Sequence, residues 1–189
     1  MKKQAIVLLA DGFELVEAMT VVDYLKRAGI GVTTVSINEK DVLSQSDVYV
    51  KADELYSEGI TPPDALIIPG GAGGAKALAS HEGVTSLVRR AAEAGKIVAA
   101  ICAGPTVLEA AGVLAGKKGT SYPGFVEDLS YASYEDQLAV TDGNIITSRG
   151  PATTIFFAEH LIRALTSDKV WDKVEKAILQ DRVSDTYKR

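Results

Sequence analysis

The sequence predicts a doubly wound α/β protein with a mostly parallel sheet and helices on both faces of that sheet. Two observations support this fold class. Short, continuous apolar runs alternate with segments of helical spacing, which is the pattern of doubly buried strands joined by helices. Three of the apolar runs also end in unusual segments, and in such sheets the ligand site lies beyond the carboxyl ends of the strands. The 189 residues are expected to form one domain, 1–189.

The first half of the chain contains three of the predicted strands. We expect strands at 4–10, 32–37 and 65–69, the second because it is rich in β-branched residues. Residues 15–28 have helical spacing, and Gly29 ends that helix. The apolar stripe expected on this helix consists of Val16, Met19, Val22 and Leu25.

The second half of the chain continues the alternation of helices and strands. An amphipathic helix is expected at 84–94, a buried strand at 97–101, and a short helix at about 105–111. Residues 138–148 hold an Asp-Gly-Asn turn between two β-like runs, which is typical of a β-hairpin.

Two further helices and a polar tail are expected at the end of the chain. The helices cover 152–166 and 169–179, and the tail covers about 181–189, where we expect the chain to be frayed. The sequence contains no internal repeat, low-complexity segment or linker, which supports a single domain.

Charge and cysteine content argue against several classes of protein. The formal net charge of −5 argues against a nucleic-acid partner, because binding to phosphate needs a basic face. The single cysteine cannot form an internal disulfide, and the apolar run at 5–10 is too short for a signal peptide. No run has the length needed to span a bilayer, so no membrane partner is expected and the predicted location is cytoplasmic.

Cys102 is the first candidate functional residue. It follows the strand at 97–101 and precedes Ala103-Gly104-Pro105, whose proline suits the first turn of a helix. The positive end of that helix would favour a thiolate and lower the pKa of the thiol below its usual value. From this segment alone, Cys102 is either a reactive nucleophile at a strand-to-helix elbow or an inert thiol of the core.

Two other segments lie at the carboxyl ends of predicted strands. The glycine-rich run at 70–74 matches neither phosphate-binding glycine motif, so its N–H groups suit an oxyanion hole or simply a tight turn. The acidic side chains within 11–17 either cap the first helix or place a carboxyl beside Cys102. In the second case, repulsion between two anions would keep one proton on the pair.

Four stretches carry a resemblance to a known family. They are DGFELVEA at 11–18, DALIIPGGAGG at 64–74, AAICAGPTVLEAAGVLAGKK at 99–118 and TSRGPATT at 147–154. In this order they resemble the ThiJ/PfpI superfamily, and most of all its DJ-one branch. The resemblance implies a flavodoxin-like fold and usually a homodimer, in which Glu14 and Arg27 match positions that tend to pair between subunits.

The resemblance also implies roles for individual residues of the site. Cys102 is the nucleophile and Glu17 is its protonated partner. The backbone of Gly70, Gly71 and Ala103 is then expected to face the thiolate or the oxyanion that forms there.

Two positions depart from the pattern of the superfamily. Many relatives carry a histidine just before the proline at 123, where this chain has Tyr122. Tyrosine is a poor base at neutral pH, so a mechanism must depend on Glu17. The protease-like branch has a histidine directly after the cysteine, where this chain has Ala103, which argues against a protease.

The remaining polar candidates are two histidines and an arginine. His81 and His160 do not have the spacing of metal ligands, so no metal site is expected. Arg149 is either a structural salt-bridge former near the site or an anchor for a carboxylate or carbonyl of the substrate.

Two main functions are compatible with these residues. The first, implied by the resemblance, is a cofactor-independent enzyme of glyoxalase III or protein deglycase type, with a small aldehyde or a glycated protein as substrate. The second is an oxidative-stress sensor or redox-regulated chaperone, since peroxide oxidises an accessible thiolate first. A thiamine-pathway or amidase-like role, suggested by family labels alone, is a third alternative.

Overall fold

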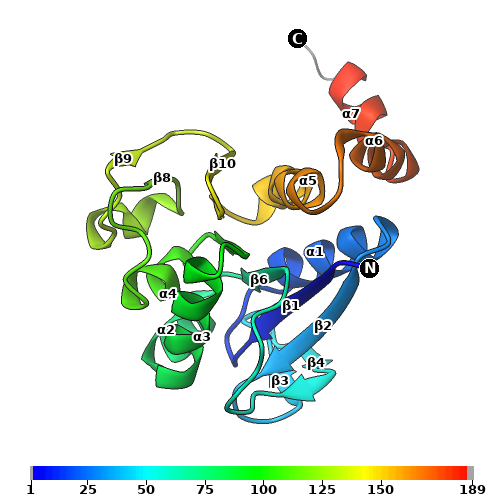
Figure 1. Ribbon diagram of the computed structural model, residues 1–189. Coiled ribbons are helices and arrows are strands. Elements are labelled where there is room, and N and C mark those ends of the chain that lie inside the picture. The colour runs from blue at the N-terminus through cyan, green and yellow to red at the C-terminus, as the bar shows by residue number, and fades with distance from the viewer. Residues whose placement is uncertain (1, 187–189) are drawn as a thin grey trace.

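The middle layer of the fold is a sheet of seven strands (Figure 1). The structure is a computed structural model and describes residues 2–186. Across the sheet the order is β10-β11-β7-β6-β1-β2-β5, and every neighbouring pair is parallel except β10 with β11. The strands are β1 Gln4–Leu9, β2 Gly31–Ser36, β5 Glu54–Leu55, β6 Ala65–Ile68, β7 Ile97–Ile101, β10 Ala139–Asp142 and β11 Ile145–Ser148. The predicted mostly parallel, flavodoxin-like sheet is confirmed.

Helices pack on both faces of this sheet. They are α1 Leu15–Arg27, α5 Thr154–Leu165 and α6 Asp168–Ala177 on one face, and α2 Ala72–Ser80, α3 Glu82–Glu93 and α4 Pro105–Ala110 on the other. Successive side chains of a strand point to opposite sides. On β1, Val7 and Leu9 therefore belong to the core under α1 and α5, whereas Leu8 belongs to the core under α2, α3 and α4.

Helix α1 packs most of the predicted stripe against the core, since Met19 and Val22 are partly buried against it. Leu25 is buried as expected, but the side chain of Val16 is 47% exposed. The buried side chains of the helix also include Glu17, Ala18 and Val21. The inward face therefore extends beyond the predicted stripe on one side, and it carries a carboxyl group.

The predicted hairpin forms as β10 and β11. Asp142 pairs with Ile145, so the connecting loop consists of Gly143 and Asn144. Gly143 has a φ of 61°, a backbone conformation that two-residue hairpin loops need and that glycine adopts without strain.

Several short elements have no clear signal in the sequence. They are the hairpin of β3 Asp41–Leu43 and β4 Tyr49–Lys51, the pair β8 Lys118–Gly119 and β9 Ser133–Tyr134, and the 3₁₀ helices Pro123–Asp128 and Pro151–Thr153. Strands of two or three residues are too short to show a periodic pattern.

The polar end of the chain is helical up to Thr186. Residues Gln180–Thr186 form α7, so the expectation of a frayed tail from 181 is wrong for this part. The rest of the expected tail, 187–189, lies outside the described residues. Among the helices that the structure describes, none is both long and apolar enough to cross a membrane.

Phe157 tests the core between α5 and the sheet, because its side chain is fully buried there. We expect Phe157→Ala to lower the free energy of unfolding by about 3–5 kcal/mol, since it removes buried apolar surface and leaves a cavity. Phe156→Ala changes the partly exposed neighbour on the same helix and should cost clearly less. Denaturant unfolding followed by circular dichroism measures both losses, and equal losses would contradict the placement of this core.

Candidate active site

The ends of β1, β6 and β7 bring the three predicted segments together. The N–H of Gly70, just after β6, donates to Oε2 of Glu17 at 2.7 Å. The carbonyl of Gly70 accepts from the N–H of Glu14 at 2.9 Å. A Cβ atom at Gly70 would lie 2.6 Å from Cβ of Cys102 and 2.6 Å from Oε2 of Glu17. Only glycine fits between these two side chains, so the thiol and the carboxyl are direct neighbours.

Cys102 adopts a left-handed backbone conformation with a φ of 63°. A residue with a Cβ atom rarely occupies this region, so the surrounding contacts must hold it there. Its N–H donates to the carbonyl of Ser148 at 3.0 Å, and its carbonyl accepts from the N–H of Tyr122 at 3.0 Å. These two bonds fix a sharp elbow between β7 and α4, and the half-buried thiol points into a surface hollow.

Two backbone N–H groups interact with the sulfur of Cys102. Those of Ala103 and Gly71 donate hydrogen bonds to it and act to lower its pKa. The N–H of Gly70 is not one of them, because it donates to Glu17. Gly70 therefore lies against Cys102 as the resemblance implies, but its N–H holds the carboxyl in place instead of donating to the sulfur.

The carboxyl group of Glu17 is almost completely removed from water. Burial raises its pKa from an ordinary 4.5 to about 7, against the lowering effects of the Gly70 N–H and the Cys102 thiol. A weaker raising effect comes from the nearby charge of Glu14. Oε1 of Glu17 is buried without a hydrogen-bond partner, and the carboxyl as a whole interacts with the Cys102 thiol. Glu17 can therefore hold or release a proton near neutral pH.

The thiol of Cys102 does not show the depressed pKa that the sequence predicts. Burial raises its pKa to about 12, and the adjacent Glu17 carboxylate adds to this effect. Because burial raises the pKa of both groups, the pair keeps at least one proton at neutral pH, and this proton can move between sulfur and carboxylate oxygen.

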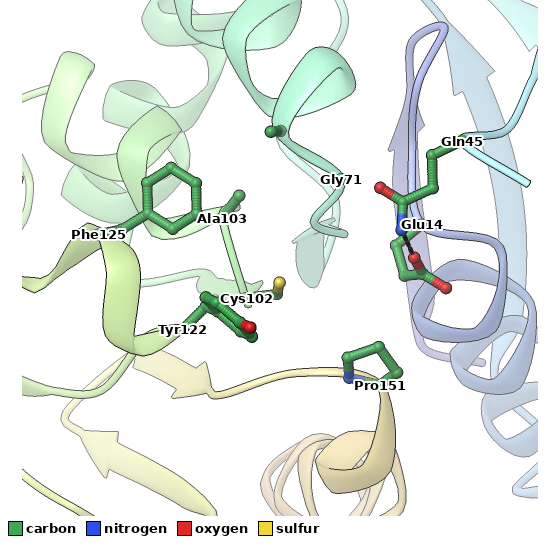
Figure 2. Close-up of a pocket in the computed structure, with 9 residues that line it drawn as sticks. Glu14, Gln45, Gly71, Cys102, Ala103, Tyr122, Phe125 and Pro151 are labelled. Carbon is green, nitrogen blue, oxygen red and sulfur yellow. Dashed lines mark hydrogen bonds between the residues drawn. The ribbon is translucent and has the colours of Figure 1, made fainter.

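The hollow in front of the sulfur has a volume of about 260 Å³ (Figure 2). It is lined by Glu14, Gln45, Gly71, Ala72, Cys102, Ala103, Tyr122, Phe125 and Pro151. The sequence pattern did not identify Gln45, which lies in a turn, or Phe125, which lies in the short 3₁₀ helix Pro123–Asp128. Pro151 had a signal, because it belongs to the TSRGPATT stretch that carries the family resemblance.

Tyr122 and Arg149 take different places around the site. Tyr122 lines the hollow, and its side chain is 50% exposed at the mouth. Arg149 lies in a neighbouring hollow that shares Tyr122 and Pro151 with the first. There it forms a salt bridge with Asp136, which favours the structural reading of this arginine.

The two histidines have local structural contacts. His81 caps α3, where its Nδ1 accepts from the N–H of Val84 at 3.2 Å. Nδ1 of His160 lies 2.8 Å from Oγ1 of Thr141, and burial lowers the pKa of the imidazole. Within residues 2–186, no three side chains of His, Cys, Asp or Glu are grouped to hold a metal ion.

The two residues expected at a dimer interface have partners within the chain. Glu14 caps α1 and accepts from the side-chain amide of Gln45, while Arg27 donates to Asp23 at 2.7 Å. The side chain of Arg27 remains 48% exposed. The pairing of Glu14 with Arg27 between subunits stays a prediction.

The fold and the site together define a flavodoxin-like α/β protein with a thiol–carboxyl pair at the carboxyl edge of its sheet. The model of the DJ-1/PfpI family matches residues 3–164. Protein dj-1beta of Drosophila melanogaster is 38% identical over 183 residues, 95% of this chain and 98% of the relative. A deglycase of Pyrococcus horikoshii is 36% identical over 162 residues, 84% of this chain and 96% of the relative. The crystal structure of Drosophila DJ-1beta superposes with a TM-score of 0.86 at 37% identity, covering 95% of this chain and 98% of that one. The chain belongs to the DJ-1/PfpI family.

Glu17→Gln tests the direction of the interaction between the carboxyl and the thiol. We expect the alkylation rate of Cys102 to level off at a lower pH in this variant than in the wild type. The substitution removes the negative charge that helps to raise the pKa of the thiol, while burial and the backbone donors remain. Rates with a neutral alkylating reagent over a pH series measure the shift. An unchanged or higher midpoint would show that Glu17 stabilises the thiolate instead of opposing it.

Proposed function

We propose that this chain is a cysteine-dependent enzyme of reactive carbonyl defence that converts methylglyoxal, glyoxal or their adducts with proteins. The observation that carries the proposal is the contact of the only cysteine with a carboxyl whose pKa is about 7. Such a group can both accept and donate a proton at neutral pH. Family membership and relatives named as deglycases support a carbonyl substrate. A cytoplasmic location and a homodimer, inferred from the sequence, complete the proposal.

The first step is the addition of the thiol to the aldehyde. The Glu17 carboxylate takes the proton of Cys102 while sulfur bonds to the aldehyde carbon and the carbonyl electron pair moves to oxygen. The N–H groups of Gly71 and Ala103 are placed to stabilise negative charge as it moves from sulfur to oxygen. Glu17 then returns its proton to the oxyanion, which gives a hemithioacetal and restores the carboxylate.

The second step moves a hydrogen between two carbons of the substrate. Glu17 removes the proton from the carbon bonded to sulfur, and the neighbouring carbonyl carbon receives a proton through an enediol. The aldehyde carbon is oxidised and its neighbour is reduced, so the reaction needs no cofactor or external oxidant. Water then cleaves the thioester and releases the hydroxy acid and the free thiol.

A second candidate function is the sensing of oxidative stress. It is favoured by the position of the sulfur in an open hollow, where peroxide can reach it. The raised pKa of the thiol works against it, because the thiolate is the form that peroxide oxidises. Counting turnovers separates the two functions: an enzyme consumes many methylglyoxal molecules per thiol, whereas a sensor reacts once with peroxide.

Substitutions at Cys102, Glu17 and Tyr122 test the assignment of roles. Cys102→Ser should abolish methylglyoxal turnover, and Glu17→Gln should lower kcat by about 10²–10⁴-fold because the amide has no transferable proton. Tyr122→Phe should cost much less, since it removes one weakly basic hydroxyl at the mouth of the hollow. Methylglyoxal consumption is measured, with circular dichroism as the control for folding. If the Tyr122→Phe variant were as inactive as Glu17→Gln, the acid–base role would have to be assigned to Tyr122.

The pH dependence of turnover follows from the pKa of Glu17. The free enzyme needs the ionised carboxylate to accept the thiol proton, so kcat/KM should rise with pH through about 7 and fall below it. An ordinary glutamate would place this step near its usual pKa of 4.5. A profile of kcat/KM against pH measures the midpoint, and a flat profile across neutrality would contradict Glu17 as the base.

A further inference from the structure

The backbone of Cys102 is held on its two sides by different kinds of contact. On one side its N–H donates to the carbonyl of Ser148 in β11, which pairs with β7 in the main sheet. On the other side its carbonyl accepts from the N–H of Tyr122, and the segment 120–122 belongs to no strand or helix. The left-handed conformation of Cys102 persists only where the surroundings hold it, so the elbow depends on what fixes this segment.

Side chains take the place of a neighbouring strand along this segment. The N–H of Thr120 donates to Oγ1 of Thr147 at 2.9 Å, and the carbonyl of Thr120 accepts from the hydroxyl of Tyr131 at 3.1 Å. The carbonyl of Ser121 accepts from the hydroxyl of Tyr134, also at 3.1 Å. Because Thr120, Ser121 and Thr147 are completely buried, bulk water is not available to replace a lost partner.

The two tyrosines are themselves fixed in place. Tyr134 lies in β9, which pairs with β8 (Figure 1). The ring of Tyr131 packs so closely on Gly119 that a side chain at residue 119 would collide with it. Burial raises the pKa of Tyr131, so its hydroxyl keeps the proton that it donates. Neither tyrosine lines the hollow in front of Cys102, so an effect on the thiol must pass through the segment that ends at Tyr122.

We propose that Tyr131 and Tyr134 are positioning residues, whose hydroxyls hold the elbow of Cys102 through the backbone of the segment 120–122. The elbow in turn places the thiol against the carboxyl of Glu17. Without either hydroxyl, a backbone carbonyl of the segment loses its donor and the segment shifts. The inference applies to any reaction of this thiol, and only its effect on turnover rests on the proposed function.

Alkylation of Cys102 tests the position of the thiol without requiring turnover. Iodoacetamide forms a bond from carbon to sulfur as iodide leaves, and the mass of the whole chain reports the reaction because Cys102 is the only cysteine. Tyr131→Phe and Tyr134→Phe each remove one hydroxyl and retain the ring. We expect both to lower the pH midpoint of alkylation toward the ordinary 9.0 of a cysteine, since a displaced sulfur loses burial and its contact with Glu17.

The same substitutions should slow the proposed reaction. We expect kcat for methylglyoxal to fall by about tenfold to hundredfold, because a small displacement of the reacting groups has effects of this size. KM should stay close to that of the wild type, since neither tyrosine touches the hollow.

Two control variants separate positioning from a general loss of stability. Tyr56→Phe removes the hydroxyl of another tyrosine that packs against the same core as Tyr131. Tyr56 directly follows β5, at the opposite edge of the sheet from β10 and β11. Val174→Ala creates a cavity under α6, away from the elbow. Both controls should leave the midpoint and kcat unchanged.

Several results would overturn the proposal. An unchanged midpoint in a folded variant rejects the role of that tyrosine, and an equal shift in Tyr56→Phe or Val174→Ala rejects both roles. If Tyr131→Phe does not fold, Tyr134→Phe decides. Where the wild type turns over, a lowered midpoint with an unchanged kcat also rejects positioning. A lowered midpoint without wild-type turnover would uphold the positioning and reject the enzyme, whereas turnover with unchanged midpoints would do the reverse.

Discussion

The hydrogen bond between the N–H of Gly70 and the carboxyl of Glu17 is the interaction on which the site depends. It joins the end of β6 to the buried face of α1. A buried carboxyl without such a donor would carry a large desolvation cost and have no fixed position. Because residue 70 has no side chain, Cys102 can approach the same carboxyl from β7. One backbone group thus sets both the position of the acid and the space for the thiol.

With this arrangement, the proposed reaction does not need a thiolate formed by a helix end. Burial raises the pKa of both groups, and a proton-accepting carboxylate lies in contact with the thiol. In the proposed reaction the nucleophile is formed during attack, when its proton passes to Glu17, while the N–H groups of Gly71 and Ala103 stabilise the negative charge. The left-handed backbone of Cys102 and the buried acid both cost stability, which the two cores of the sheet offset.

The fold, and the proximity of the three segments that form the site, could be predicted because both follow from the alternation of strands and helices along the chain. Doubly buried strands leave continuous apolar runs, and parallel strands bring their carboxyl ends to one edge. The inward face of α1 could not be read from the pattern, because Val16 is apolar yet exposed, while Glu17 is charged yet buried. Gln45 lies on the loop of a hairpin whose strands have three residues each, too short for any periodicity. The pKa of Cys102 depends on the balance between burial, which raises it, and two backbone donors, which lower it. That balance depends on the folded geometry and cannot be predicted from the sequence.

Tyr122 stands where many relatives have a histidine. It contacts the elbow through its backbone and lines the hollow with its side chain. The contact that Tyr122 makes with the elbow is a backbone one, its N–H to the carbonyl of Cys102, so the exchange of side chains leaves the nucleophile in place. Its half-exposed side chain is at the mouth, where a histidine could carry a positive charge and attract anions. Tyrosine offers a hydroxyl in place of an imidazole there. In the proposed reaction, the substitution removes a base from the mouth of the hollow and leaves proton transfer to Glu17, the carboxyl that interacts with the thiol.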